Sequence, residues 1–411
     1  MRNRISSIII DPNKSEHDYN SLILTKESQY YYSYGEIGFD LKVLDSSINI
    51  LNELDEFRGV DCIITIGDGI DFTPLCDLSI EYRFKWIHVT EFDPKKLVDY
   101  IINVFLYNIN RDKKSNEKIF SIFTCTYKTP HTDFDRLYTS LLNQTYRNWN
   151  WFILDDSPND DTINYITSKH DPRIVIVKNV SNHGNIGFNK KIAAMSCNGD
   201  YLVEVDHDDE LTSDCLEKLL EAFNKYPDVD FVYSYALEDC GGQPVNYGDY
   251  FSYGLGSYIY EKVNGVEYKI ATSPDINAIS IRAIQAMPNH VRCWKSDFYR
   301  MISGHNPELS VLDDMDIIIR TFLYGKIAKI EKVLYIQHQG SDDRSSGNGT
   351  TQSKRFLEIQ RTNEYLRMKY NKQIHERVLE LGGEDPCWRG EYELADMYCS
   401  HDNLKSFNYT I

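Results

Sequence analysis

Short apolar runs alternate along the chain with longer segments whose apolar residues recur at helical spacing. From residue 119 onward this alternation is regular. Strands that alternate with helices form βαβ units, which build a mostly parallel sheet with helices on both faces. The pattern predicts helices at 135–146, 162–170, 190–197 and 214–226. It predicts strands at 119–127, 150–156, 173–179, 200–206 and 229–236. We therefore expect an α/β fold with a Rossmann-like, mostly parallel mixed sheet.

Two weaker regions flank this series. Toward the N-terminus, β-like runs at 6–10, 21–25, 60–67 and 84–90 precede a helical pattern at 95–109. Toward the C-terminus, residues 352–381 read as one or two amphipathic helices followed by a poorly patterned tail. The polar segment 108–118 reads as a linker. The predicted domains are an N-terminal α/β accessory domain at 1–110, a catalytic domain at 118–346 and a helical extension at 352–411.

Composition narrows the class of partner. The net charge of −18 argues against nucleic acid or anionic lipid, because both require a basic face. The nine cysteines show neither a disulfide framework nor zinc-ligand spacing. Apolar runs are too short for a membrane span or for the core of a signal peptide. We expect a soluble, cytoplasmic protein.

Acidic residues follow the strand at 200–206, where Asp206, Asp208 and Asp209 crowd into one loop. Mg²⁺ and Mn²⁺ take oxygen ligands and share them between carboxylates and the phosphates of a substrate. A divalent cation would relieve the repulsion among these carboxylates. The alternative is that one aspartate caps the helix that begins near Ser213 and that the others are solvated.

A second pair, Asp155 and Asp156, ends the strand at 150–156. Such a pair can accept hydrogen bonds from a base imide and a ribose hydroxyl, although the following "SPND" also fits ordinary turn chemistry. Tyr127 ends the first strand of the series and could stack on a base, or it could simply pack.

A third group, Asp313, Asp314 and Asp316, begins a predicted helix. Acidic residues interact favourably with a helix N-terminus, so capping is one interpretation, and a general base is the other. His338 and Arg344 flank a Gly/Ser-rich loop with the composition of a mobile lid or of an ordinary exposed loop.

Four fragments taken in order resemble the family 2 glycosyltransferases with the GT-A fold over residues 118–346. They are "CTY", "LLNQTYRNWNWFILDDSPNDDT", "GDYLVEVDHDDEL" and "LDDMDIIIRTFLYGKIAKIEKVLYIQHQGSDDRSS". Departures from the family pattern are Lys128, His207 and Asp313. None of these departures removes a role.

The resemblance implies a role for each matching position. The nucleotide site would contain Cys125, Thr126, Tyr127, Asp155, Asp156, Asp206, His338 and Arg344. The metal would be held by Asp206 and Asp208, with Asp209 as an alternative ligand. Asp314 matches the catalytic base, and Asp313 beside it is an alternative.

The resemblance also implies the reaction. A sugar would pass from a nucleotide sugar, most commonly a UDP-sugar, to a hydroxyl of a glycan, glycoprotein or lipid-linked acceptor. The transfer would depend on Mn²⁺ or Mg²⁺ and would invert the anomeric configuration. Sugar or phosphate contacts are expected from Asn289, His290, Arg292 and His305, for which core or surface roles are the alternative. The flanking domains could also form a homodimer.

Two other functions fit part of the pattern. A sugar-phosphate nucleotidyltransferase would require a Gly-rich phosphate loop after the first strand, and "TCTYKTPHTDF" has none. A scaffold that binds nucleotide sugars or glycans without turnover would not need the intact Asp206, Asp208 and Asp314.

Overall fold

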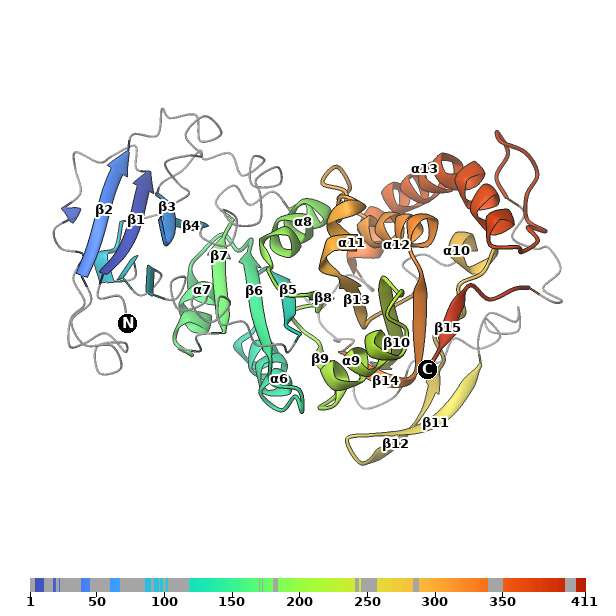
Figure 1. The fold of residues 1–411 in the computed structure, drawn as a ribbon, viewed down its shortest axis with the longest axis horizontal. Helices are drawn as coiled ribbons and strands as arrows, with labels where there is room; N and C mark the ends of the chain where they lie inside the picture. Colours follow the sequence, from blue (N-terminus) through green and yellow to red (C-terminus); the bar gives the residue numbers. More distant parts are fainter. Residues whose placement is uncertain are drawn as a thin grey trace. The chain divides into compact units, whose positions relative to one another are not determined.

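The structure is a computed structural model (Figure 1). It describes residues 4–10, 18–19, 22, 38–44, 60–66, 86–89, 92–95, 97–98, 101–102, 118–169, 171, 173–179, 184–240, 244, 257–283, 288–338, 350–395 and 404–411. The chain divides into two compact units. The first consists of Met1–Lys128, Trp149–Gly184 and Ile192–Gly199, and the second of Thr129–Asn148, Asn185–Lys191 and Asp200–Ile411. This division cuts through the predicted catalytic domain, so the predicted boundaries stay a prediction.

The first unit begins with a small parallel sheet. Its strands, in the order β2-β1-β3-β4, are β1 (Arg4–Ile10), β2 (Gly38–Leu44), β3 (Cys62–Ile66) and β4 (Trp86–Val89). Buried isoleucines of β1 and β3 pack against helical residues near Leu97 and Ile101. β1, β3 and β4 match the predicted β-like runs at 6–10, 60–67 and 84–90, and β2 is an addition to them. The predicted strand at 21–25 and the linker at 108–118 lie, apart from Leu22 and Lys118, outside the described residues.

Three further parallel strands belong to the first unit, in the order β5-β6-β7. They are β5 (Phe120–Thr126), β6 (Trp149–Asp155) and β7 (Ile174–Lys178), with α7 (Asp161–Thr167) following β6. Nearly every residue of these strands is buried. Strands covered on both faces read as continuous apolar runs, which is the pattern that identified them in the sequence.

The second unit contains a mixed sheet in the order β15-β14-β10-β13-β8. Its strands are β8 (Tyr201–Glu204), β10 (Phe231–Asp239), β13 (Arg292–Lys295), β14 (Ile327–His338) and β15 (Asn408–Thr410), and β9 (Glu210–Leu211) pairs with β14. β13 is antiparallel to both neighbours, whereas β10, β14 and β15 are mutually parallel.

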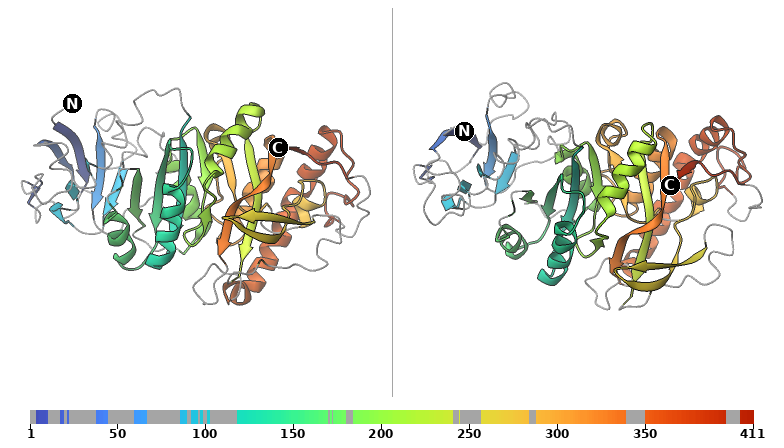
Figure 2. Two further views of the ribbon diagram at one scale, coloured as in Figure 1. Left: turned by 90° about the horizontal axis from the view of Figure 1, so that it is seen from below. Right: turned by 60° about the horizontal axis from the view of Figure 1, so that its bottom comes forward.

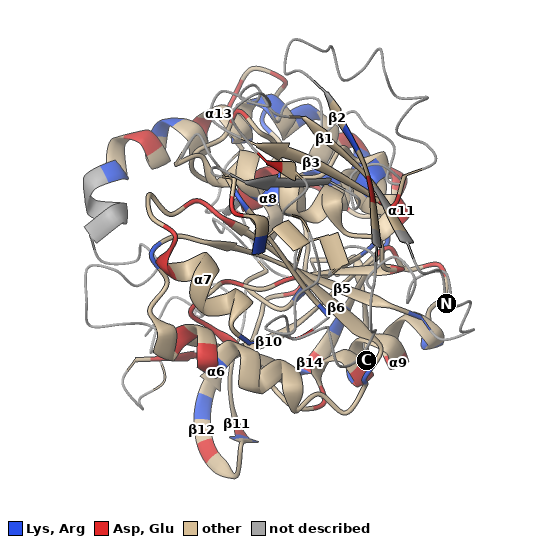
Figure 3. Ribbon diagram, turned by 90° about the vertical axis from the view of Figure 1, so that its left-hand side faces the viewer, with Lys and Arg blue, Asp and Glu red and all other residues tan. Residues whose placement is uncertain are grey.

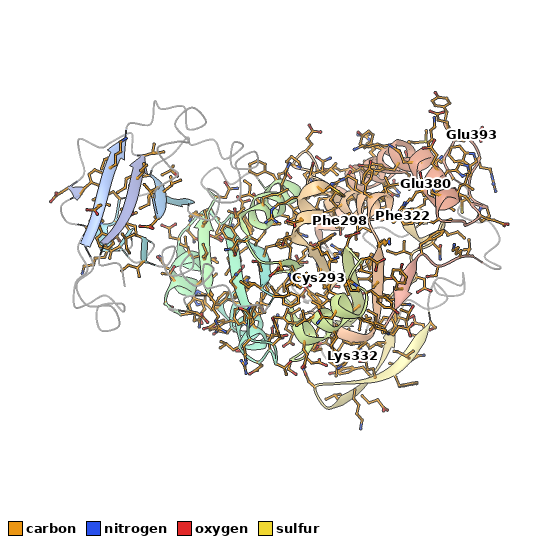
Figure 4. All side chains as sticks on the ribbon, in the orientation of Figure 1. Cys293, Phe298, Phe322, Lys332, Glu380 and Glu393 are labelled. Carbon is orange, nitrogen blue, oxygen red and sulfur yellow. The ribbon has the colours of Figure 1, made fainter. Side chains whose placement is uncertain are left out.

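Helices cover both faces of the second unit's sheet (Figures 1 and 3). α9 (Cys215–Lys225) lies on one face, α11 (Ser296–Met301) and α12 (Asp313–Tyr324) lie on the other, and α6 (His131–Leu142) contacts β9. Cys293 of β13, Phe298 of α11 and Phe322 of α12 are buried in this unit (Figure 4). The remaining short helices are α8 (Ile186–Ser196) and α10 (Ser280–Ala283). The predicted fold class, a mostly parallel mixed sheet with helices on both faces, is confirmed.

The C-terminal part of the second unit forms one long helix and a short strand. Residues predicted as one or two helices form the single helix α13 (Thr350–Glu380), which lies beside α12. Tyr370 of α13 donates a hydrogen bond to Asp316 of α12 at 2.7 Å. The tail predicted to be poorly patterned includes β15. A hairpin of β11 (Tyr258–Val263) and β12 (Val266–Ala271) packs on β10 and β14 (Figure 2). Among the described helices, none combines the length and the apolarity that crossing a bilayer requires.

Candidate functional site

Asp155 and Asp156, both predicted to contact the nucleotide, lie at the carboxyl end of β6 in the first unit, beside the end of the parallel strand β5. The register of β5 and β6 pairs Thr126 with Asp155, and the Thr126 hydroxyl donates to Asp155 Oδ1 at 2.8 Å. The Ser157 hydroxyl donates to the same oxygen at 2.6 Å. Asp156 Oδ2 accepts the backbone N–H of Gly184 at 3.1 Å. We call Thr126, Asp155, Asp156 and Ser157 the Asp155 group.

The two aspartates of this group have different surroundings. Asp155 is fully buried, and burial raises the pKa of its carboxyl against the opposing effect of the hydrogen bonds from Ser157 and Thr126. Its side chain therefore fastens the ends of β5 and β6 together. Cys125 is half-buried, whereas Tyr127 is 47% exposed, with Lys128 Nζ 5.1 Å from its ring centroid. An exposed tyrosine ring offers an apolar surface on which a base can stack.

A larger group of charged side chains lies in the second unit around the ends of β8 and β13 and the start of α12. We call it the charged cluster, and its members are Lys190, Glu204, Asp206, His290, Arg292, His305, Asp313 and Asp314. The structure thus brings together three of the four residues expected to contact sugar or phosphate. The fourth, Asn289, donates instead to Gln337 Oε1 at 2.9 Å.

Glu204 is the centre of the charged cluster. Its side chain is 1% exposed, and Oε1 lies 2.5 Å from Lys190 Nζ and 3.5 Å from Arg292 Nη1. His290 Nε2 is 3.7 Å from the same oxygen. Burial opposes ionisation of Glu204, but the charges of Lys190 and Arg292 outweigh burial and hold its pKa well below the usual range. Burial likewise opposes the charge on Lys190, and Glu204 and Asp206 overcome it, so the pKa of Lys190 is raised. Both side chains are therefore charged at neutral pH.

Asp206 lies at the more exposed edge of the charged cluster. Its side chain is 28% exposed, with Oδ1 3.8 Å from Lys190 Nζ and Oδ2 3.7 Å from His290 Nε2. Among the described residues, Glu204, Asp206 and His290 form the group whose acidic and imidazole ligand atoms, all within 4.8 Å of one another, could hold a metal ion. This group shares only Asp206 with the metal ligands predicted from the sequence.

The other two aspartates of the loop are buried. Asp209 accepts a hydrogen bond from the Tyr335 hydroxyl at 2.7 Å and one from the His338 backbone N–H at 2.9 Å. Burial, together with the neighbouring Asp208 and Asp206 charges, raises the pKa of Asp209 well above its usual range. Asp209 thus anchors the loop to β14, and both of its oxygens are already engaged by protein donors.

Asp208 is 4% exposed, and its backbone carbonyl accepts a hydrogen bond from the Arg136 guanidinium of α6. The N-cap position of the next helix, α9, is occupied by Asp214 and not by an aspartate of the loop, and Asp214 makes no side-chain capping hydrogen bond there. His338, predicted as a nucleotide contact, has its ring Nε2 2.8 Å from Glu210 Oε1. Arg344 lies outside the described residues.

The two aspartates that begin α12 differ sharply in exposure. Asp313 is 4% exposed, and burial, against the attraction of Lys190, raises the pKa of Asp313 to about 7. The Asp314 side chain is 21% exposed, and its Oδ2 lies 3.3 Å from Arg292 Nη2. Asp314 is therefore the more accessible carboxylate, and a buried cation holds it in place.

Asp316, the third aspartate of α12, is fully buried. Arg320 donates to Asp316 Oδ2 at 2.8 Å through Nε, and the Tyr370 hydroxyl donates to Oδ1. Asp316 thus joins α12 to α13 and has a structural role.

Close backbone packing brings α8 to the charged cluster. The Gly187 N–H donates to the Leu309 carbonyl at 3.2 Å, and a Cβ at Gly187 would lie 2.3 Å from the carbonyl oxygen of Asn306. Only glycine permits this approach. Residues three apart share a helix face, so the packing of Gly187 also sets the position of Lys190.

The sequence did not single out Lys190 and Glu204, which appeared only as ordinary members of a helix and a strand. The detectable signal was Glu204 itself, because a carboxylate inside the run "YLVEV" must find a cation if that strand is buried. Nothing in the sequence identified Lys190 as that cation, since its partner is 14 residues away.

Residues 121–275 match a family model described as glycosyl transferase family 2. Over 226 residues the chain is 27% identical to the protein named "Putative colanic acid biosynthesis glycosyl transferase WcaA" of Escherichia coli K12, covering 54% of this chain and 73% of that protein. Over 252 residues it is 25% identical to the chondroitin synthase of Escherichia coli, covering 60% of this chain and 31% of the synthase.

The solved structures that align with this chain have lower sequence identity to it. Residues 1–349 of Staphylococcus aureus TarS in complex with UDP-GlcNAc align with a TM-score of 0.46 and 14% identity, covering 64% of this chain and 72% of that one. GalNAc-T7 with UDP, GalNAc and Mn²⁺ aligns with a TM-score of 0.41 and 12% identity, covering 55% of this chain and 45% of that one.

Proposed function

We propose that the chain, whose residues 121–275 match the family model described as glycosyl transferase family 2, transfers a sugar from a nucleotide sugar to an acceptor hydroxyl. The proposed donor is a UDP-sugar, and the proposed acceptor is a glycan, a glycoprotein or a lipid-linked glycan. The observation that carries this proposal is the pair at the start of α12. There a buried Asp313 adjoins a partly exposed Asp314 held by Arg292, 3.3 Å away.

The nucleotide is proposed to bind at the carboxyl ends of β5 and β6. The exposed ring of Tyr127 would lie against the base, and Asp156 would accept a hydrogen bond from the base or ribose. Cys125 and Thr126 would line the site. Asp155 would act by fixing the strand ends, because its Oδ1 already accepts the Thr126 and Ser157 hydroxyls.

The proposed metal ligands are Asp206 and Asp208, which supply the carboxylate oxygens that Mg²⁺ and Mn²⁺ prefer. The charge pattern supports this choice, because burial raises the pKa of Asp206 but the Lys190 charge outweighs burial and keeps that pKa below its usual value. Asp209 fits the role less well, since Tyr335 and His338 occupy its oxygens. When bound, the metal would neutralise the negative charge that develops on the departing diphosphate.

Asp314 is proposed as the general base that takes the proton of the acceptor hydroxyl. A carboxylate that must meet a substrate has to be accessible, and Asp314 is more exposed than Asp313. Arg292 Nη2, 3.3 Å from Asp314 Oδ2, holds this carboxylate in place. Attack by the hydroxyl on the face opposite the diphosphate would invert the anomeric configuration in one step.

The test uses the full chain with UDP-sugars, Mn²⁺ and a panel of glycan acceptors. We expect metal-dependent release of UDP together with a product whose anomeric proton, seen by NMR, has the configuration opposite to that of the donor. Asp208→Ala should abolish metal-dependent turnover. Undiminished turnover in this variant would reject the proposed metal ligands, and a product with retained configuration would reject the single displacement.

An inactive scaffold remains distinguishable by the same experiment. Tight binding of nucleotide sugar, with neither hydrolysis nor transfer to any acceptor, would favour it. Formation of a nucleotide sugar from a sugar phosphate and a nucleoside triphosphate would instead favour a nucleotidyltransferase. The accessory domain at 1–110 and the extension at 352–411 are proposed to position the acceptor, cover the catalytic domain or form a homodimer.

A further inference from the structure

Among the described residues, the side chains that could hold a metal ion already have a cation beside them. Glu204, Asp206 and His290 bring their ligand atoms within 4.8 Å of one another. The Lys190 ammonium lies against the same group, 2.5 Å from Glu204 Oε1 and 3.8 Å from Asp206 Oδ1. The positive charge that these carboxylates require is thus supplied by the chain itself.

Lys190 is held firmly in this position. Its side chain is 10% exposed, and it approaches from α8, whose Gly187 packs against the backbone of Asn306 and Leu309. The Gly187 N–H also donates to the Leu309 carbonyl at 3.2 Å, which fixes this part of α8. If the ammonium left, the buried Glu204 carboxylate would lose the cation closest to it, and an uncompensated buried charge is costly.

A divalent ion at this group would have to compete directly with Lys190. Glu204 Oε1 is the oxygen that both cations would use, and Arg292 Nη1 already lies 3.5 Å from the same atom. A metal ion there would stand close to two fixed positive charges in a buried region, where repulsion is strong. His290 Nε2, the nitrogen that completes the group, is 3.7 Å from Glu204 Oε1 and has no hydrogen-bond partner among the described residues.

We propose that Lys190 is the permanent cation of the Glu204–Asp206–His290 group and keeps this group closed to divalent metal ions. This inference deepens the proposed function, because it restricts the donor's metal ion to Asp208 and the exposed side of Asp206. Lys190 then acts as a positioning residue that holds Asp206 in place and prevents a second, histidine-containing metal site from forming.

The test is a metal-binding titration of the full chain without nucleotide or acceptor. Co²⁺ is the probe, because imidazole nitrogen is a good ligand for such ions and its visible absorption reports coordination, and saturating Mg²⁺ is present to occupy sites made only of oxygen. We expect the wild-type chain and Lys190→Arg to show no His290-dependent absorption band. Lys190→Met should gain one Co²⁺ equivalent per chain with a new band, and Lys190→Met combined with His290→Ala should lose that band.

Lys191→Met is the matched control. It removes a lysine charge from the next position of α8, and none of the ion pairs among the described residues joins Lys191 to Glu204 or Asp206. This variant should bind Co²⁺ as the wild type does. Lys190→Met combined with Glu204→Gln removes both members of the buried pair and should gain no Co²⁺ equivalent.

Two results would overturn the proposal. One is a wild-type chain whose Co²⁺ band disappears in His290→Ala, because a metal would then have displaced Lys190. The other is a folded Lys190→Met chain that gains no Co²⁺. If Lys190→Met does not fold, the comparison of wild type with His290→Ala still decides. Because no step uses a sugar nucleotide, failure of the transferase proposal would leave this titration unaffected, and the two failures are distinguishable.

Discussion

The Asp155 group and the charged cluster each contain a buried carboxylate, but the side chains that stabilise it differ between the two. Asp155 is held by two hydroxyl donors, and its pKa is raised because burial outweighs these hydrogen bonds. Glu204 is equally buried, but Lys190 and Arg292 lower its pKa. Hydroxyl donors stabilise a carboxylate without supplying charge, whereas buried cations keep it ionised. The comparison suggests that the first arrangement supports the strands and that the second supports charge-dependent chemistry.

The largest effect is expected from removing the proposed base of the charged cluster. Asp314→Asn should lower kcat by about 10² to 10⁴, because general-base assistance contributes about that much, with a smaller change in the KM for the donor. Steady-state kinetics with varied donor and acceptor check this. Asp313→Asn is the matched control and should cost less than about tenfold, since asparagine resembles the protonated form that a pKa of about 7 allows. The opposite ranking would transfer the base role to Asp313.

The next effect concerns stability. Glu204→Gln should lower the free energy of unfolding by about 3–5 kcal/mol, because it leaves Lys190 and Arg292 buried without their shared partner. Urea denaturation measures the change. Lys190→Met combined with Glu204→Gln should recover part of the loss, since one stranded charge is then removed. If Glu204→Gln is neutral, the charged cluster is solvated rather than buried.

A smaller cost is expected in the Asp155 group. Thr126→Val removes one hydroxyl donor to Asp155 and should lower the free energy of unfolding by about 1–3 kcal/mol. Thr167→Val, in α7 of the same unit, removes a hydroxyl that donates to the Ile163 carbonyl and should cost about 0.5 kcal/mol. Equal losses of unfolding free energy in the two variants would show that the hydrogen bond from Thr126 to Asp155 contributes no more to stability than the one from Thr167 to the Ile163 carbonyl.

The smallest expected effect is on how the stability contributed by Asp155 changes with pH. An ordinary paired carboxylate stabilises the fold more as the pH rises, and Asp155 should do the opposite. Because the folded pKa of Asp155 is raised, its stabilising contribution is complete below about pH 4, the pKa of an unfolded aspartate, and is lost as pH rises through the folded value. The free energy of unfolding of the wild type minus that of Asp155→Asn, measured by urea denaturation across this pH range, should therefore decline as the pH rises. A difference that grows with pH would mean that Asp155 is ionised and paired.

Much of the fold followed from apolar periodicity. The strands at 119–127, 150–156 and 173–179 correspond to β5, β6 and β7, because strands buried on both faces leave continuous apolar runs. The strand β15 was missed, since three residues at the sheet edge carry no periodic signal. The start of α12 was predicted because acidic residues precede a run with helical spacing.

The site was predicted less completely. The sequence pointed to Asp206 and Asp314 through motif resemblance, and those positions lie together in the charged cluster with Lys190 and Arg292. It could not show that an Asp209 oxygen accepts a hydrogen bond from Tyr335, because the two residues are 126 positions apart and only the fold brings them together. Tertiary pairing of charges is therefore the information that the linear pattern lacks.

The carboxylates after β8 are proposed to hold a metal that binds a nucleotide diphosphate, and a thermal-shift measurement tests this proposal most directly. Wild type and Asp208→Ala are heated with UDP, GDP, CDP or dTDP, with and without Mn²⁺. We predict that UDP stabilises the wild type only with Mn²⁺, by about 2.7 kcal/mol at a hundredfold excess over the dissociation constant, and that Asp208→Ala loses this shift. A shift that is independent of metal, equal in the two proteins, or absent for every nucleotide would contradict the claim.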